Sequence, residues 1–261
     1  MTTLLLPAVA LWRREVVRFV RQRSRVTGAF AQPLVFWLLL GGGLNASFRP
    51  AGMAGTSYVE YFYPGTIALV LLFTAIFATI STVEDRREGF LQGVLVAPVP
   101  RWVIVLGQAL GGTTLAVVQG VLFMLLAPLL GIHLTLGSFL ATFIVLTVVA
   151  LGLTSLGLVI AWRMESTQGF HAIMNLILIP IWLLSGAFFP GTGAPAPLRW
   201  LMAVNPLTYG MAALRRCLYL SNPAAAGPVP ALLPSLLISL VFCFLAFYAA
   251  VRTASRSGAV Q

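Results

Sequence analysis

The side chains that could do chemistry gather in one short segment of the 261-residue chain, between residues 83 and 101. Five charged residues follow one another there: Glu84, Asp85, Arg86, Arg87 and Glu88. Neighbouring carboxylates and guanidinium groups form strong ion pairs, with one another or with charges on another protein. Catalysis would need an activated nucleophile, a general base or a metal-binding group of residues, and we find none beside the cluster. The cluster therefore predicts a binding surface rather than a catalytic centre.

Four apolar residues at helical spacing follow the charged cluster: Phe90, Leu91, Val94 and Leu95. Pro98 ends this pattern, and Arg101 opens the next apolar run. A short amphipathic helix with charged neighbours suits docking into a groove on another protein. A helix that only caps the membrane would show the same pattern. On the docking interpretation, the candidate residues in the connection 84–101 are Glu84, Arg87, Glu88, Gly89, Phe90, Leu91, Leu95 and Arg101.

Six apolar stretches, each about long enough to cross a bilayer, must position this segment. They lie near Ala29–Leu44, Phe62–Val83, Val103–Leu130, Leu134–Trp162, Phe170–Phe189 and Leu232–Val251. A helix satisfies its own backbone hydrogen bonds in lipid. The alternating segments of roughly 10 residues that build a membrane β-barrel are missing from the sequence. The sequence therefore predicts an all-α, polytopic membrane protein, with one transmembrane domain of six helices over residues 1–261.

The composition excludes a soluble fold, because 59% of the residues are hydrophobic and only 8% are charged. Soluble domains carry about 25% charged residues. The net charge of +10 comes from 16 arginines without any lysine, and most of them fall on one side of the predicted membrane. By the positive-inside rule, both termini are then cytoplasmic and the chain is a multi-pass protein of the cytoplasmic membrane. Orientation and anionic membrane lipids explain the excess charge, so we expect no nucleic-acid partner.

Residues 8–25, within an N-terminal element spanning 1–28, are predicted to form an amphipathic helix. Its apolar side comprises Val9, Trp12, Val16, Val17, Phe19 and Val20, and five arginines form most of the other side. Such a helix lies in the plane of the membrane interface. It is either a topology anchor or a lever under the first span that touches a cytoplasmic partner.

The segment 190–230 is the largest piece predicted outside the membrane. Two short apolar helices are expected there, near Leu198–Val204 and Leu207–Leu220, lying at or re-entering the outer membrane surface. Arg215 and Arg216 would then lie near headgroups or pack inside a re-entrant hairpin. A single histidine near the fifth span, His171, has no second ligand at metal-binding spacing, so no metal site is predicted.

The sequence lacks the parts that would let the chain use energy by itself. Without lysine it has no Gly-x-x-x-x-Gly-Lys-Ser/Thr loop for binding nucleotide phosphates. The buried carboxylates of ion-coupled carriers are also missing from the predicted spans. A transporter of this kind must take its energy from a partner, or act as a passive pore.

Three regions together resemble the permease subunit of ABC-2 type exporters. The first runs from Glu84 through Phe90–Leu91 to Pro98-Val99-Pro100-Arg101 and Gly107. The second is Leu184-Ser185-Gly186-Ala187-Phe188-Phe189-Pro190, and the third is Asn205-Pro206-Leu207-Thr208-Tyr209 with Arg215 shortly after. Their order and spacing, with six spans and an amphipathic N-terminal helix, cover nearly the whole chain. Phe90 departs from the small polar residue that is usual in the family.

The resemblance implies that residues 84–101 form a coupling helix that docks on a separate ATPase subunit. It implies two ATPase copies, which hold ATP and Mg, and a second permease copy or a related chain. No cofactor and no catalytic site are expected on this chain. Its cargo would be hydrophobic or amphipathic, such as a drug, a lipid or a glycan. Candidates for the substrate path are Gln32, Asn45, Asn175 and Ser185.

Two rival hypotheses remain open at the level of sequence. The first is a membrane scaffold or assembly protein whose 84–101 segment binds something other than an ATPase. The second is an intramembrane enzyme. An adjacent reading frame that encodes an ATP-binding loop would favour the permease.

Overall fold

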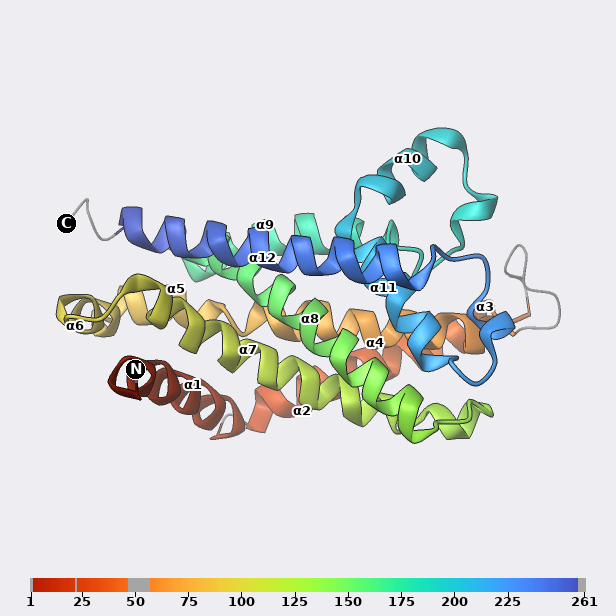
Figure 1. The fold of residues 1–261 in the computed structure, drawn as a ribbon, viewed down its shortest axis with the longest axis horizontal. Coiled ribbons are helices and arrows are strands. Elements are labelled where there is room, and N and C mark those ends of the chain that lie inside the picture. The colour runs from red at the N-terminus through yellow and green to blue at the C-terminus, as the bar shows by residue number, and fades with distance from the viewer. Residues whose placement is uncertain (1, 22, 47–56, 258–261) are drawn as a thin grey trace.

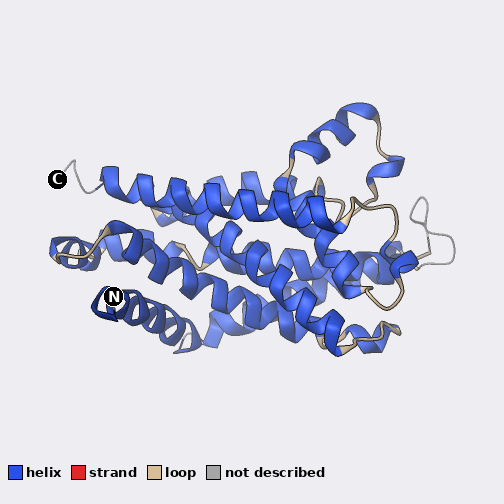
Figure 2. Ribbon diagram, in the orientation of Figure 1, coloured by secondary structure: helices blue, strands red, loops and turns tan. Residues whose placement is uncertain are grey.

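The computed structural model describes residues 2–21, 23–46 and 57–257, with the side chains of 2–4, 23–26, 29, 30, 32 and 257 left out. Every regular element in these residues is helical (Figure 2). Runs of apolar residues without strand-like alternation explain this, because a helix pairs its own backbone groups. The predicted all-α fold class is confirmed.

Four helical stretches are long and apolar enough to cross a membrane: Tyr58–Arg87, Arg101–Leu130, Leu136–Ala161 and Leu232–Arg256. They contain α4 (Tyr58–Phe77) and α5 (Ile80–Arg87), then α7 (Arg101–Met124), α8 (Leu136–Ala161) and α12 (Leu232–Ser257). They run along the long axis of the molecule (Figure 1), and α8 packs against α12, α7 and α4. These stretches match the second, third, fourth and sixth predicted spans.

The first and fifth predicted spans are shorter in the structure than the sequence suggested. The first lies in α2 (Arg23–Phe36), the π-helix η1 (Trp37–Gly41) and α3 (Gly42–Leu44), but its apolar part is only Pro33–Leu44. The fifth is α9 (Thr167–Leu183), which has 17 residues. It stops before Phe189 because the chain turns at Gly186, whose φ of 80° favours glycine.

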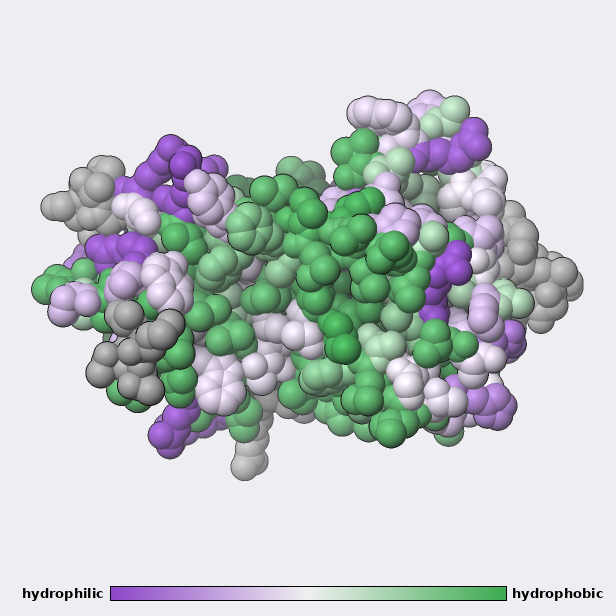
Figure 3. All heavy atoms as spheres, viewed as in Figure 1, coloured by the Kyte–Doolittle hydropathy of each residue, from purple (hydrophilic) through white to green (hydrophobic). Residues whose placement is uncertain are grey.

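The exposed surface divides into an apolar middle and polar ends. Figure 3 shows hydrophobic side chains across the middle of one face, with hydrophilic groups gathered toward both ends. Helix α12 contributes many of them, because only 22% of an 18-residue apolar stretch within it is buried. An apolar band of this kind on the visible face is typical of a surface in contact with lipid. The chain is therefore a polytopic helical membrane protein.

Two short helices cover the end of the molecule that carries α3: α10 (Ala196–Val204) and α11 (Pro206–Leu218). The Asn205 side chain accepts a hydrogen bond from the Leu207 backbone N–H at 3.0 Å and so begins α11. Most of α11 is buried against α12, α8 and α4, whereas α10 projects from the bundle (Figure 1). Helix α11 is thus a packed part of the fold.

Candidate functional site

A sharp turn separates α5 from the short helix α6 (Phe90–Val96). Gly89 adopts a φ of 80°, a left-handed conformation that a side chain would oppose. Its N–H donates to the Arg86 carbonyl at 3.3 Å and closes the end of α5. Helix α6 ends at Ala97 before Pro98, which matches the predicted stop. The Arg101 guanidinium then donates to the Leu95 carbonyl at 3.1 Å and ties the start of α7 to the end of α6.

One side of α6 is buried within the chain itself. Leu91 is only 1% exposed, and Val94 and Leu95 are partly buried. They pack on an apolar cluster from α1, α7, α8 and α12 that includes Ile104 and Trp162. Leu91 therefore fixes α6 in place and is not available as the surface anchor that the apolar pattern suggested.

The other side of α6 is open to a partner. Phe90 is 40% exposed and Val96 is 86% exposed. Arg87 and Glu88 are exposed beside them at the end of α5, and Gln92 is exposed on α6. We call these five residues the α6 face. It combines two apolar side chains with two opposite charges.

The rest of the charged cluster points inward and holds the N-terminal helix α1 (Thr2–Arg21). Arg14 forms two hydrogen bonds to the Asp85 carboxylate, one of them at 2.6 Å. Arg18 bridges Asp85 at 2.9 Å and Glu84 at 2.6 Å. Asp85 is only 1% exposed, so its charge needs these partners. We call these four residues the α1–α5 ion cluster.

The ion cluster also reaches the α6 face. The Arg14 guanidinium lies 3.8 Å from the centre of the Phe90 ring, in a cation–π contact. Arg86 donates to the Trp162 carbonyl at 2.8 Å and ties α5 to the end of α8. Helices α1, α5 and α6 are thus joined at one end of the bundle, where α12 also ends (Figure 1).

Helix α1 packs on α7 through a side different from the apolar side that the sequence predicted. A Cβ added at Gly107 would lie 2.7 Å from the Ala8 carbonyl oxygen, and one at Gly111 would lie 2.6 Å from the Glu15 Cβ. Small residues on α7 therefore let α1 approach closely. The predicted apolar residues Val9 and Trp12, by contrast, are exposed. Val9 can lie against lipid there, whereas the Trp12 indole lies at the edge of the contact and donates a hydrogen bond to the Thr114 hydroxyl of α7 at 3.0 Å.

Two titratable groups of α1 are perturbed by this packing. The hydrogen bond to Asp85 is the main cause that raises the pKa of Arg14, and burial opposes it. Burial raises the pKa of the Glu15 carboxyl, which is 8% exposed, while Ser81 and Arg14 partly oppose the shift. Glu15 is a functional-site residue that sequence reasoning missed, because a single carboxylate among arginines looks like part of a solvated face.

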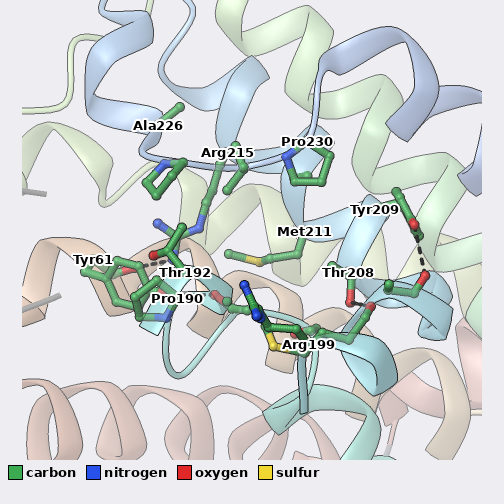
Figure 4. Close-up of a pocket in the computed structure, with 18 residues that line it drawn as sticks. Tyr61, Pro190, Thr192, Arg199, Thr208, Tyr209, Met211, Arg215, Ala226 and Pro230 are labelled. Carbon is green, nitrogen blue, oxygen red and sulfur yellow. Dashed lines mark hydrogen bonds between the residues drawn. The ribbon is translucent and has the colours of Figure 1, made fainter. Parts of the chain in front are cut away.

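Three of the four path candidates have described side chains, and no hydrogen bond joins these three. Asn45 accepts a hydrogen bond from the Tyr58 backbone N–H at 2.9 Å, and Asn175 is exposed on α9. Ser185 is buried and donates to the Trp182 carbonyl at 2.6 Å; it lines a cavity beside α10 and α11 (Figure 4). Gln32 lies in α2, but its side chain is outside the described part of the structure.

No group of three or more histidine, cysteine, aspartate or glutamate side chains is placed to hold a metal ion within the described residues. Cys217 and Cys243 are both buried and unlinked. The candidate site is therefore made of ion pairs and an exposed apolar face.

An apolar surface band, four membrane-length helices within the described residues and a short helix held out at one end define a multi-pass helical membrane protein. The chain belongs to the ABC-2 type transporter family, whose pattern matches residues 8–219. Membrane subunits of this family carry no catalytic site themselves and work with a separate ABC ATPase.

Comparison with individual proteins gives relatives that align over most of the chain. The chain is 29% identical over 210 residues to nodulation protein J of Rhizobium leguminosarum bv. trifolii, covering 79% of each chain. It is 25% identical over 258 residues to nodulation protein J of Neorhizobium galegae, covering 97% of this chain and 94% of the relative. It is 26% identical to the inner membrane transport permease YadH of Escherichia coli strain K12, over 79% of this chain and 80% of the relative.

Proposed function

We propose that the chain is the permease of an ATP-driven exporter, with the α6 face as its docking surface for the ATPase. The single observation that carries the proposal is the geometry of α6, which is anchored on one side by Leu91 and presents Phe90 and Val96 on the other. An exposed aromatic residue flanked by charges suits a groove on a partner protein. Arg87 and Glu88 would set the register with that groove.

The ion cluster supports a role for α1 as a lever. Arg14 and Arg18 connect α1 to α5 at Asp85, and α1 rests along the glycines of α7. A displacement of α6 by the ATPase would therefore be passed to α1, and from α1 to α2 and the first span. The charge-assisted hydrogen bonds to the nearly buried Asp85 carboxylate are strong, so α1 and α5 should move together.

The finer topology follows from the same proposal. Six helices cross the cytoplasmic membrane, including the short Pro33–Leu44 and α9 stretches, and both termini are cytoplasmic. The name of YadH as an inner membrane transport permease agrees with this location. Exposed arginines at the α6 end, such as Arg87 and Arg163, fit the positive-inside rule.

The functional unit would contain two ATPase subunits, which hold ATP and Mg, and two permease chains. A hydrophobic or amphipathic cargo would move along faces of the first, second and fifth spans, with Asn175 exposed on α9. Scarce charge within the spans suits an apolar cargo, because an unpaired charge in that region is expensive.

The test is co-purification with the ATPase and measurement of transport-linked ATP hydrolysis after Phe90→Asp combined with Val96→Asp. Both side chains are exposed, so the fold should persist while a docked face would have to bury two new carboxylates. We expect the ATPase to be lost or its hydrolysis uncoupled from transport.

The matched control is Leu129→Asp, which places a carboxylate at an equally exposed apolar position far from α6; Leu129 is 79% exposed. This variant should keep the ATPase and coupled hydrolysis. Full assembly and coupling in the double variant would disprove the docking assignment. A chain that assembles with partners but never supports transport would instead support the scaffold hypothesis.

A further inference from the structure

A cavity of about 330 Å³ opens beside α10 and α11, away from the ion cluster (Figure 4). This volume is in the range of small-molecule sites. Most of its wall is apolar, with Pro190, Met202, Met211 and Val229 among the lining residues. None of the lining residues is an aspartate or a glutamate.

Arg215 is the most unusual member of this wall. It is 1% exposed, and its guanidinium donates one hydrogen bond, at 2.8 Å, to the Tyr61 backbone carbonyl. The same group lies 4.1 Å from the centre of the Tyr61 ring. Its Nε has no hydrogen-bond partner. Arginine stays charged even when burial lowers its pKa, so a full positive charge is left without a counter-ion among the described residues.

The neighbouring Arg216, by contrast, hydrogen-bonds through its guanidinium to the loop before α12. Its Nε donates to the Pro230 carbonyl and its terminal nitrogen to the Val229 carbonyl at 2.7 Å. Arg216 therefore fastens the loop before α12. Arg215 makes no such hydrogen bonds to the loop, so holding this loop in place does not explain why Arg215 is buried here.

A second arginine enters the cavity from α10. Arg199 is exposed, lines the same cavity, and forms no ion pair in the described part of the chain. Figure 4 shows the Arg199 and Arg215 side chains reaching into the cavity from different helices. Two guanidinium groups without a carboxylate make the cavity electropositive.

Three hydroxyl groups of the wall are already occupied as donors. Thr208 donates to the Met202 carbonyl at 2.6 Å, and Tyr209 donates to the Ala203 carbonyl at 2.9 Å. Ser185 donates to Trp182 within its own turn. The charged nitrogens of Arg199 and Arg215 are therefore the strongest donors that the wall offers a ligand, which favours an anion over a neutral sugar.

We propose that this cavity binds an oxyanion, held by Arg199 and Arg215, and that the anion is the phosphate or carboxylate headgroup of an amphiphile whose apolar part lies on the proline and methionine wall. An oxyanion in the cavity would supply the counter-charge that the guanidinium of Arg215 lacks. A role in receiving exported cargo rests on the proposed function, but the binding itself does not.

The test uses the purified full-length chain in an uncharged maltoside detergent, without ATPase or nucleotide. Isothermal titration calorimetry measures binding of dihexanoyl phosphatidate and, separately, of inorganic phosphate. We expect saturable binding of phosphatidate that Arg199→Gln weakens about tenfold or more, because a charge-assisted contact is lost. Arg199 is exposed, so this variant should fold even if Arg215→Gln does not.

Two further variants sharpen the result. Ala203→Trp narrows the cavity at an exposed wall position without changing charge, and should also weaken binding. Arg163→Gln removes an exposed arginine remote from the cavity, and should leave binding unchanged. Equal binding by wild type and Arg199→Gln, or no binding of either anion, would overturn the oxyanion site. Inorganic phosphate binding as tightly as phosphatidate would overturn the amphiphile assignment.

The outcome is separable from that of the proposed function. A chain that binds phosphatidate here but never couples hydrolysis to transport contradicts the exporter alone. A coupled exporter whose folded permease binds neither anion contradicts the oxyanion site alone.

Discussion

At the scale of single residues, Glu15 gives the α1 contact a pH dependence. Burial raises the pKa of this carboxyl above its ordinary value. An unfolded glutamate titrates near about 4.3. As the pH rises above that value, the unfolded state loses its proton first, and the folded state becomes less stable relative to it. The loss is complete once the pH passes the raised pKa of folded Glu15.

We therefore predict that Glu15→Gln raises the melting temperature at pH 8 and leaves it unchanged near pH 4. Glutamine keeps the shape and cannot ionise against Asp85 and the apolar surroundings. Melting followed by tryptophan fluorescence in detergent at several pH values measures the effect. Glu165→Gln, at an exposed carboxylate, is the control and should change little. If Glu15→Gln is instead less stable than the wild type at pH 8, the prediction is wrong. The ion pair between Glu15 and Arg14, at 3.2 Å, would then stabilise the fold by more than burial of the charge destabilises it.

The glycines around α6 give a second prediction at this scale, with opposite signs for two similar substitutions. Gly89→Ala places a Cβ on a residue with φ 80° and should destabilise the chain by about 1–2 kcal/mol. Gly93→Ala adds a Cβ inside α6 with nothing within 4 Å, and should stabilise by up to about 1 kcal/mol. Melting temperatures of the two variants measure this, and a shift in the same direction for both would contradict the turn geometry.

At the scale of elements, the packing of α1 on α7 is the contact that a lever requires. Gly107→Val would drive a side chain into the Ala8 backbone at 2.7 Å and the Leu11 Cβ at 2.8 Å. We expect α1 to lift off, at a cost of about 1–3 kcal/mol, because backbone atoms cannot move aside as a flexible side chain can. Transport-linked hydrolysis should fall while the ATPase still binds the α6 face.

Limited proteolysis of α1 measures the lifting directly. Gly42→Ala is the matched control, because an added Cβ there meets nothing within 4 Å. Unchanged proteolysis and coupling in Gly107→Val would show that α1 is a passive anchor, which is the alternative that the sequence left open.

The same elements show how far sequence patterns reach. The short helix after the charged cluster and its end at Pro98 could be predicted from residue types, because they depend on local preferences. Which side of α6 faces inward could not. That choice depends on Trp162, Ala250 and Ala254, which come from distant helices. The side of α1 that packs on α7 could not be predicted either, because apolar residues such as Val9 mark the lipid-facing surface, whereas small and charged residues make the contacts.

At the scale of the whole molecule, hydropathy predicted the long helices but not the lengths of all six. Pro33–Leu44 would span roughly 18 Å and the 17 residues of α9 roughly 26 Å, at 1.5 Å per residue. A hydrocarbon core is about 30 Å thick. The fifth span is shortened by the turn of the chain at Gly186, and the first by the polar start of α2. Averaging hydropathy over many residues hides both of these features. For Arg215 the sequence left headgroup contact and packing inside a hairpin both open, and only the packing of α11 shows that it is buried.

The proposed orientation of the whole molecule can be tested by labelling its two ends from opposite sides of the membrane. Val96→Cys and Leu129→Cys are each introduced after Cys217→Ala and Cys243→Ala remove the two native thiols. Both new positions are highly exposed, at 86% and 79% respectively. With α6 in the cytoplasm, a membrane-impermeant maleimide should label Leu129→Cys in intact spheroplasts and Val96→Cys only in inverted vesicles. Permeabilised cells, in which both should react, control for accessibility. Labelling of Val96→Cys in intact spheroplasts would place α6 outside, where no ATPase could reach it.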